Sequence, residues 1–132
     1  MPAYNFLVPP PAIETNESYL VWNADTPASG TLSQQVALAR SRGGYPPAAS
    51  VEVIFSASPG AFEIDVQEAD TDLASNYVGA LGGALTTATL GANGTYVVRI
   101  DLNPVTARFL SLLMKTAPTW TSLTVTARIV RQ

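Results

Sequence analysis

Short segments in which apolar and polar residues alternate recur along the chain, and this period of two predicts β-strands. The clearest are residues 51–56 (VEVIFS) and 62–67 (FEIDVQ), each of which places its large apolar side chains on one face. Between them, Pro59 and Gly60 stand at the centre of a turn. We therefore predict that the two segments form a hairpin around a tight turn.

Further segments fit strands by the same pattern: 18–23, 76–81, 95–102 and 122–131. In the last of these, every second residue from Leu123 to Ile129 is apolar, and we expect these side chains to face the core. Segment 31–39 (TLSQQVALA) also alternates; a short helix is the alternative there, but turn residues on both sides favour a strand. Residues 82–94 are mostly small and predict a loop.

The region 103–116 fits two interpretations. The Asn-Pro pair at its beginning is typical of a helix start, and the apolar residues that follow satisfy both helical and strand spacing. We favour one helical turn over 104–107 and a strand over 108–116, because the final strand then gains an antiparallel partner. Trp120 would lie near the tip of the connection between these two strands.

About seven or eight short strands with turn residues between them are typical of an all-β, antiparallel β-sandwich, and a jelly roll is the more specific expectation. No internal repeat is evident in the sequence. At 132 residues the chain is long enough for one domain with its own core, which we place at residues 18–132.

Residues 1–17 differ from the remainder because they are rich in proline and show no regular period. The run Pro9 to Pro11 favours polyproline II and excludes a central strand, so this segment is predicted to be an extended arm. Disordered tails are usually poor in large apolar residues, and we therefore expect the arm to dock on its own domain or on a neighbouring subunit, with disorder as the third alternative. The candidate interface residues are Tyr4, Phe6, Leu7, Val8, Ile13 and Trp120.

The composition excludes several classes of function. The chain contains no Cys and no His, and so it lacks thiolate metal sites, the commonest metal ligand and the usual general base near neutral pH. We expect no catalytic residue, no metal and no cofactor. The net charge is −3 and no basic run occurs, which disfavours nucleic-acid binding. No apolar run is long enough to cross a membrane and no signal-peptide pattern is present, so we expect synthesis in a cytoplasm.

Charged residues make up only 13% of the chain. A small domain usually carries about twice this fraction. Two interpretations remain open: part of the surface is covered by a partner, or the outer face of a sheet consists mostly of Thr and Ser. 

The acidic residues Asp65, Glu68, Asp70 and Asp72 could gather oxygen ligands for calcium. The EF-hand pattern fails, because its glycine and its closing glutamate are missing. We interpret these acids as the solvated end of a hairpin and not as a reaction centre. A second candidate site is a set of aromatic residues that could stack on sugars, although core or interface packing is favoured for them: Tyr19, Trp22, Tyr45, Tyr77 and Trp120.

The proline-rich arm, the segment GAFEIDVQEADTDLASNYV and the closing pattern RIDLNPVTARFLSLLMKTAPTWTSLTVTARIVR resemble small jelly-roll head proteins of tailed bacteriophages, the decoration or cement proteins. The similarity spans residues 51–132. It implies a non-enzymatic protein that binds the outer surface of the capsid and stabilises the lattice of the major capsid protein. It also implies a homo-oligomer, with a trimer favoured, located on the exterior of the virion and made in the bacterial host cytoplasm.

Several phage tail and carbohydrate-binding jelly rolls end in a similar way. The alternative is therefore a carbohydrate-binding module of a phage tail or receptor-binding protein. It would use aromatic side chains such as Trp22 or Trp120 to stack on sugar rings.

Overall fold

The computed structural model describes residues 10–14, 17–38, 49–72, 77–86, 95–100 and 108–131. Within these ranges the chain is all-β and contains no helix. The strands are β1 (Ala12–Ile13), β2 (Ser18–Asp25), β3 (Thr31–Leu32), β4 (Val36–Leu38), β5 (Ala49–Phe55), β6 (Glu63–Ala69), β7 (Val78–Thr86), β8 (Thr95–Ile100), β9 (Phe109–Thr116) and β10 (Val125–Arg131).

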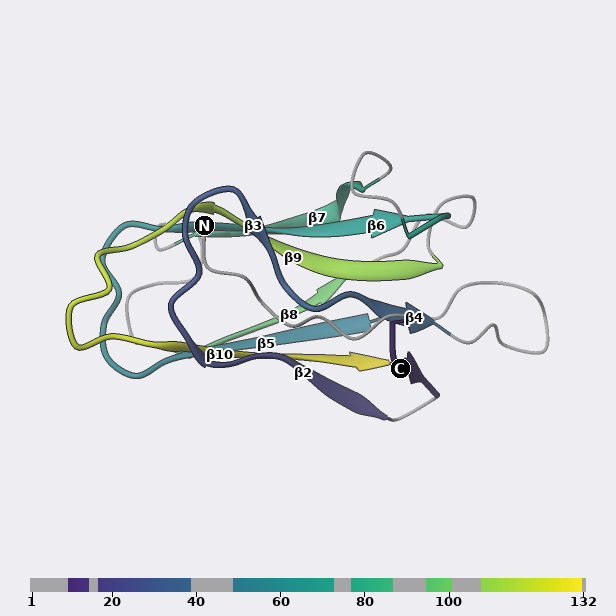
Figure 1. Ribbon diagram of the computed structural model, residues 1–132, viewed down its shortest axis with the longest axis horizontal. Helices are drawn as coiled ribbons and strands as arrows, with labels where there is room; N and C mark the ends of the chain where they lie inside the picture. Colours follow the sequence, from purple (N-terminus) through teal and green to yellow (C-terminus); the bar gives the residue numbers. More distant parts are fainter. Residues whose placement is uncertain are drawn as a thin grey trace.

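The strands form two sheets that face each other, which confirms the predicted β-sandwich. The four-stranded sheet has the order β2-β10-β5-β8. The six-stranded sheet has the order β1-β4-β9-β6-β7, and β3 also pairs with β9. Figure 1 shows β6, β7 and β9 in one layer and β2, β5 and β10 in the other. All pairs are antiparallel except β1 with β4.

Strand pairing is nested along the chain. The first long strand, β2, pairs with the last, β10; then β4 pairs with β9, β5 with β8, and β6 with β7. Successive pairs in this series belong alternately to the four-stranded and the six-stranded sheet. The described strands therefore behave as one long antiparallel ribbon that is wrapped so that its pairs close a two-layered core.

The core follows directly from the alternation in the sequence. Val51 and Val53 of β5, Ile64 of β6, Leu112 of β9 and Ile129 of β10 are all fully buried between the sheets. Burial of a side chain of this size contributes roughly 1.5–3 kcal/mol each relative to exposure. The inward orientation predicted for the alternate residues of the last strand is confirmed, since they are at most 6% exposed.

The predicted hairpin of segments 51–56 and 62–67 is wrong, although both strands are present. β5 lies in the four-stranded sheet and β6 in the six-stranded sheet, so residues 56–62 connect the two layers. The rings of Phe55 and Phe62 lie 4.8 Å apart at the two ends of this connection. Both edges of β5 are already occupied, by β10 and β8, which leaves no position for β6 beside it.

The single strand predicted over 31–39 is interrupted. Its ends form β3 and β4, which both pair with β9, while residues 33–35 lie between them outside any strand. Ser33 is fully buried, and its hydroxyl accepts a hydrogen bond from the backbone N–H of Leu112 at 2.8 Å. A side chain thus replaces a backbone carbonyl in the ladder, which is a recognised way for serine to end regular pairing.

Two further corrections concern the second half of the chain. The strand expected over 108–116 exists as β9, but it does not pair with the last strand; β9 pairs with β6 and β10 pairs with β2 and β5. Residues 82–86, expected to be loop, belong to β7. The helical turn expected over 104–107 lies outside the described residues.

The described part of the proline-rich segment runs along the six-stranded sheet. Ala12 and Ile13 form β1, which pairs in parallel with β4, and Ile13 is only 3% exposed. The backbone N–H of Ala37 donates to the carbonyl of Pro11 at 2.8 Å, and Arg131 reaches Glu14 at 3.5 Å. This short stretch therefore packs on its own chain.

Candidate binding surface

The acidic residues singled out in the sequence do not converge on one point. Asp65 lies 3.9 Å from the ammonium group of Lys115, which is also 3.3 Å from Glu63. Glu68 is 2% exposed, whereas Asp70 lies at the surface. Within the described ranges, no group of three or more acidic residues is arranged to hold a metal ion. The acids lie in β6 and in the segment just after it, which leads to β7, the strand that pairs with β6.

Asp72 has a defined structural role. Its carboxylate accepts a hydrogen bond of 2.7 Å from the hydroxyl of Tyr77, which is buried. Burial of the phenol, this hydrogen bond and the negative charge of Asp72 together raise the pKa of Tyr77 far above the ordinary 10.0. Tyr77 is therefore held neutral, as a hydrogen-bond donor.

The aromatic residues considered for sugar stacking do not form a shared exposed platform. Trp22 is 2% exposed and belongs to the core. Trp120 is half-buried; its ring centroid lies 6.3 Å from that of Phe55, and its indole N–H donates to the carbonyl of Pro27 at 2.9 Å. Tyr77 is buried against Asp72, while Tyr45 lies outside the described residues.

The residues proposed for an interface fall into two groups. Ile13 is buried in the core of its own chain and Trp120 packs against that core. Tyr4, Phe6, Leu7 and Val8 lie outside the described residues. Their part in an interface stays a prediction.

A different surface, which sequence reasoning did not identify, is the outer face of the four-stranded sheet. Alternate residues of β2, β10 and β5 point away from the core: we call Ser18, Leu20, Ser50, Glu52, Ile54, Thr126, Arg128 and Val130 the outer face. The strand register places Leu20, Arg128 and Glu52 in one row across three strands. Val130 lies opposite both Ser18 and Ser50, and Thr126 lies opposite Ile54.

The outer face carries two of the three large apolar side chains that are exposed within the described ranges. Leu20 is 39% exposed and Ile54 is 38% exposed. In the sequence, each of them is an apolar residue at an outward position of a strand. Ile54, for example, lies between Val53 and Phe55, which face the core. A period of two reveals which positions share a face, but it does not show that an outward apolar residue forms part of a larger surface.

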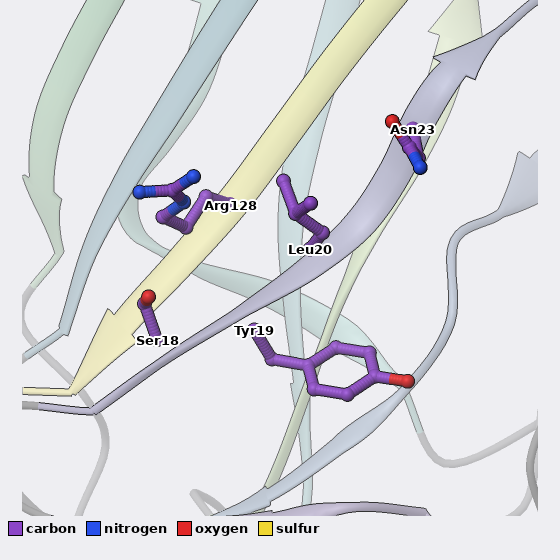
Figure 2. Close-up of a pocket in the computed structure, with 5 residues that line it drawn as sticks. All are labelled: Ser18, Tyr19, Leu20, Asn23 and Arg128. Carbon is purple, nitrogen blue, oxygen red and sulfur yellow. The ribbon is translucent and has the colours of Figure 1, made fainter.

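An open depression of about 500 Å³ lies at the β2 edge of this face, lined by Ser18, Tyr19, Leu20, Asn23 and Arg128. Figure 2 shows Leu20 and the ring of Tyr19 on opposite sides of β2, with the Arg128 side chain extending from β10 away from Leu20. The guanidinium group of Arg128, the amide of Asn23 and the hydroxyl of Ser18 are groups that can bind a polar ligand with a negative charge, whereas Tyr19 packs against the core.

Among the eight residues named above, which belong to β2, β10 and β5, Arg128 and Glu52 are charged, and they are direct cross-strand neighbours. Cross-strand side chains at such positions are close enough to interact. Nevertheless, within the described ranges neither residue takes part in an ion pair. On β2, β10 and β5, the face therefore presents one positive and one negative group side by side, with hydroxyl and apolar groups around them.

Comparison of the sequence with protein-family models gave no match, and comparison with curated protein sequences gave none either. Within the described ranges, no helix is long and apolar enough to cross a membrane.

Proposed function

We propose that the protein is a non-enzymatic structural protein that binds the outer surface of a phage capsid and stabilises the lattice of the major capsid protein. The observation that carries this proposal is the nested pairing of β2 with β10, β4 with β9, β5 with β8 and β6 with β7, alternating between the two sheets. This winding supports the jelly-roll interpretation, and jelly rolls are common in viral capsid and lectin domains.

Other features agree with a role in binding. The sequence offers no His or Cys, and 13% charged residues is few for a protein whose whole surface meets water. The outer face of the four-stranded sheet is a sheet surface with exposed Leu20 and Ile54, which suits contact with another protein. Repeated weak contacts are sufficient on a lattice, because an oligomer binds many sites at once.

The proposed partners are the major capsid protein and further copies of the chain itself, with a trimer favoured, on the exterior of the virion. Net acidity suits the outside of a DNA-filled shell better than its interior. The arm of residues 1–17 is proposed to contribute to the contact between subunits or with the capsid through Tyr4, Phe6, Leu7 and Val8.

The test is co-sedimentation of the purified protein with capsids that lack it. Saturable binding at a fixed number of copies per capsid, with greater resistance of the capsids to heat, is the expected result. Failure to bind capsids from the phage that encodes the protein contradicts the proposal.

The contribution of the arm can be tested separately. Deletion of residues 1–17 also removes Ile13 from the core, so deletion of residues 1–9 is the cleaner variant because it leaves β1 in place. We expect the shorter deletion to weaken oligomers or capsid binding without lowering the melting temperature. Unchanged assembly and unchanged capsid binding would show that residues 1–9 have no such role.

A second candidate function is favoured by the depression at the edge of β2. Its lining includes Arg128, Ser18 and Asn23, whose guanidinium, hydroxyl and amide groups can bind the carboxylate and hydroxyl groups of an acidic sugar, in line with a carbohydrate-binding module of a tail or receptor-binding protein. A panel of glycans tests it. Binding of an acidic glycan that is lost in Arg128→Ala supports this function, and the absence of binding across the panel removes it.

A further inference from the structure

We propose that the chain before β2 forms a strap that opens while the sandwich stays folded, and that the buried guanidinium group of Arg131 favours the open state. We call the described residues 10–14 and 17 the strap. The opening of the strap does not depend on capsid binding.

The strap joins the two sheets at one end of the sandwich. On the six-stranded sheet, the N–H of Ala37 in β4 donates to the carbonyl of Pro11 at 2.8 Å. On the four-stranded sheet, the N–H of Arg131 in β10 donates to the carbonyl of Glu17 at 2.9 Å. Between these two bonds, the side chain of Ile13 is 3% exposed and belongs to the core. Figure 1 shows this purple segment beside the end of β10.

The strap is held more weakly than the strands that it touches. β1 has two residues and lies at the edge of its sheet, where it pairs with β4. β4 keeps β9 on its other side, so the loss of β1 leaves the remaining ladder of the six-stranded sheet in place. Segments with few buried contacts at the edge of a fold open locally at a lower free energy than global unfolding requires.

Arg131 opposes the closed state of the strap. Its side chain is 3% exposed, and its Nη1 lies 3.5 Å from Oε2 of Glu14, whereas a strong bond of this kind measures about 2.8 Å. Among the described residues, the Nε of Arg131 finds no hydrogen-bond acceptor. A buried cation with so few partners is costly, and opening removes Glu14 and Glu17 from beside it and lets water approach.

The two members of this ion pair therefore have opposite effects on the strap. The Glu14 side chain is 68% exposed, so it keeps its water when Arg131 is replaced by an apolar residue. Replacement of Glu14, in contrast, leaves the buried cation without its ion-pair partner. Removal of Arg131 should tighten the strap, whereas removal of Glu14 should loosen it.

Opening changes the point at which the arm leaves the sandwich. In the closed state the chain is held from Pro11 onwards, and in the open state it is held from Ser18, the first residue of β2. Residues 11–17 extend over roughly 20–25 Å when they are released. An open strap thus lets the arm reach further towards a neighbouring subunit, a consequence that, unlike the opening itself, rests on the proposed role of the arm.

Amide hydrogen exchange in the full-length chain measures the opening. The N–H of Ala37 is bonded to the strap, whereas the N–H of Leu38, the next residue, is bonded to the carbonyl of Arg108 at 2.8 Å on the side of β9. After correction for intrinsic rates, we expect Ala37 to exchange at least about tenfold faster than Leu38, because it needs only the local opening.

The variants test the role of the buried charge. Arg131→Met keeps a long side chain without the charge and should slow the exchange of Ala37 by about tenfold. Arg128→Met is the matched control, because it removes an exposed charge from the same strand and should leave the exchange unchanged. Glu14→Gln should accelerate the exchange severalfold, and Ile13→Val should accelerate it by about two- to tenfold through lost core packing.

Equal protection of Ala37 and Leu38 in the wild-type chain would show that the strap opens only when the sandwich unfolds, and it overturns the proposal. Unchanged or faster exchange of Ala37 in Arg131→Met overturns the role assigned to the buried cation, since the ion pair with Glu14 would then hold the strap closed. Thermal unfolding checks that each variant is folded. If Arg131→Met does not fold, Arg131→Leu removes the same charge with a shorter side chain, and the same outcomes apply to it.

Discussion

Replacing Ser33 with Ala should destabilise the fold far more than the loss of one hydroxyl at the surface would. The Ser33 side chain is 0% exposed, and its oxygen accepts the backbone N–H of Leu112 at 2.8 Å. It also lies 3.2 Å from the hydroxyl of Ser111, which in turn donates to the carbonyl of Ser33 at 3.0 Å. With alanine at this position, the N–H of Leu112 remains buried without its acceptor.

The expected magnitude follows from this geometry. A buried donor that loses its partner costs about 1–3 kcal/mol. At a typical unfolding entropy of about 2.1 cal/mol/K per residue, the 132-residue chain should lose roughly 7 °C in melting temperature for a central loss of about 2 kcal/mol. The free energy of unfolding is measured by urea denaturation and the melting temperature by calorimetry.

Ser56→Ala is a closely matched control. Ser33 exchanges two hydrogen bonds with Leu112, since its own N–H also donates to the carbonyl of Leu112 at 2.7 Å. Ser56 exchanges the same two bonds with Thr124: its N–H donates to the carbonyl of Thr124 at 3.0 Å, and its hydroxyl accepts the N–H of Thr124 at 2.9 Å. Ser56 is exposed, so water can replace its hydroxyl and the loss should stay below about 0.5 kcal/mol. Equal losses in Ser33→Ala and Ser56→Ala would refute the reasoning that burial determines the cost.

Three further predictions concern other parts of the fold. The raised pKa of Tyr77 means that above pH 10.0, where unfolded tyrosine ionises, the folded state retains a proton that the unfolded state loses, so stability falls as the pH rises. Tyr77→Phe should reduce this decline, as measured by urea unfolding between about pH 9 and pH 11; an identical decline in both proteins would contradict it. Ala24 has a φ of 52° and Gly30 a φ of 86°, so Ala24→Gly should stabilise the fold by up to about 1 kcal/mol, whereas Gly30→Ala should destabilise it by about 1–2 kcal/mol. The same sign of change for both variants in thermal unfolding would show that backbone strain does not govern these positions. Leu112→Ala should lower the free energy of unfolding by about 2–5 kcal/mol, because Leu112 is fully buried. Leu113 is half-buried, and a urea midpoint of Leu112→Ala no lower than that of Leu113→Ala would contradict the placement of Leu112 in the core.

The sequence alone was sufficient to locate most strands and to orient their side chains. Alternation is a local property: a strand with one buried face must place apolar residues at every second position, whatever lies beside it. For this reason β5, β6, β9 and β10 were predicted close to their observed positions. The interruption at Ser33 was not predictable, because it depends on a hydrogen bond to Leu112, which is distant in the sequence.

The tertiary structure alone decided which strands are neighbours. The pattern in β5 and β6 fits a hairpin and a connection between sheets equally well, since either arrangement buries the same faces. Pairing is set by the closure of the whole two-layered core, in which β5 lies between β10 and β8 while β6 lies between β9 and β7. The same closure brings Leu20, Arg128 and Glu52 into one row from three strands far apart in the sequence. Such a row has no local signature, because each strand contributes only one of its residues.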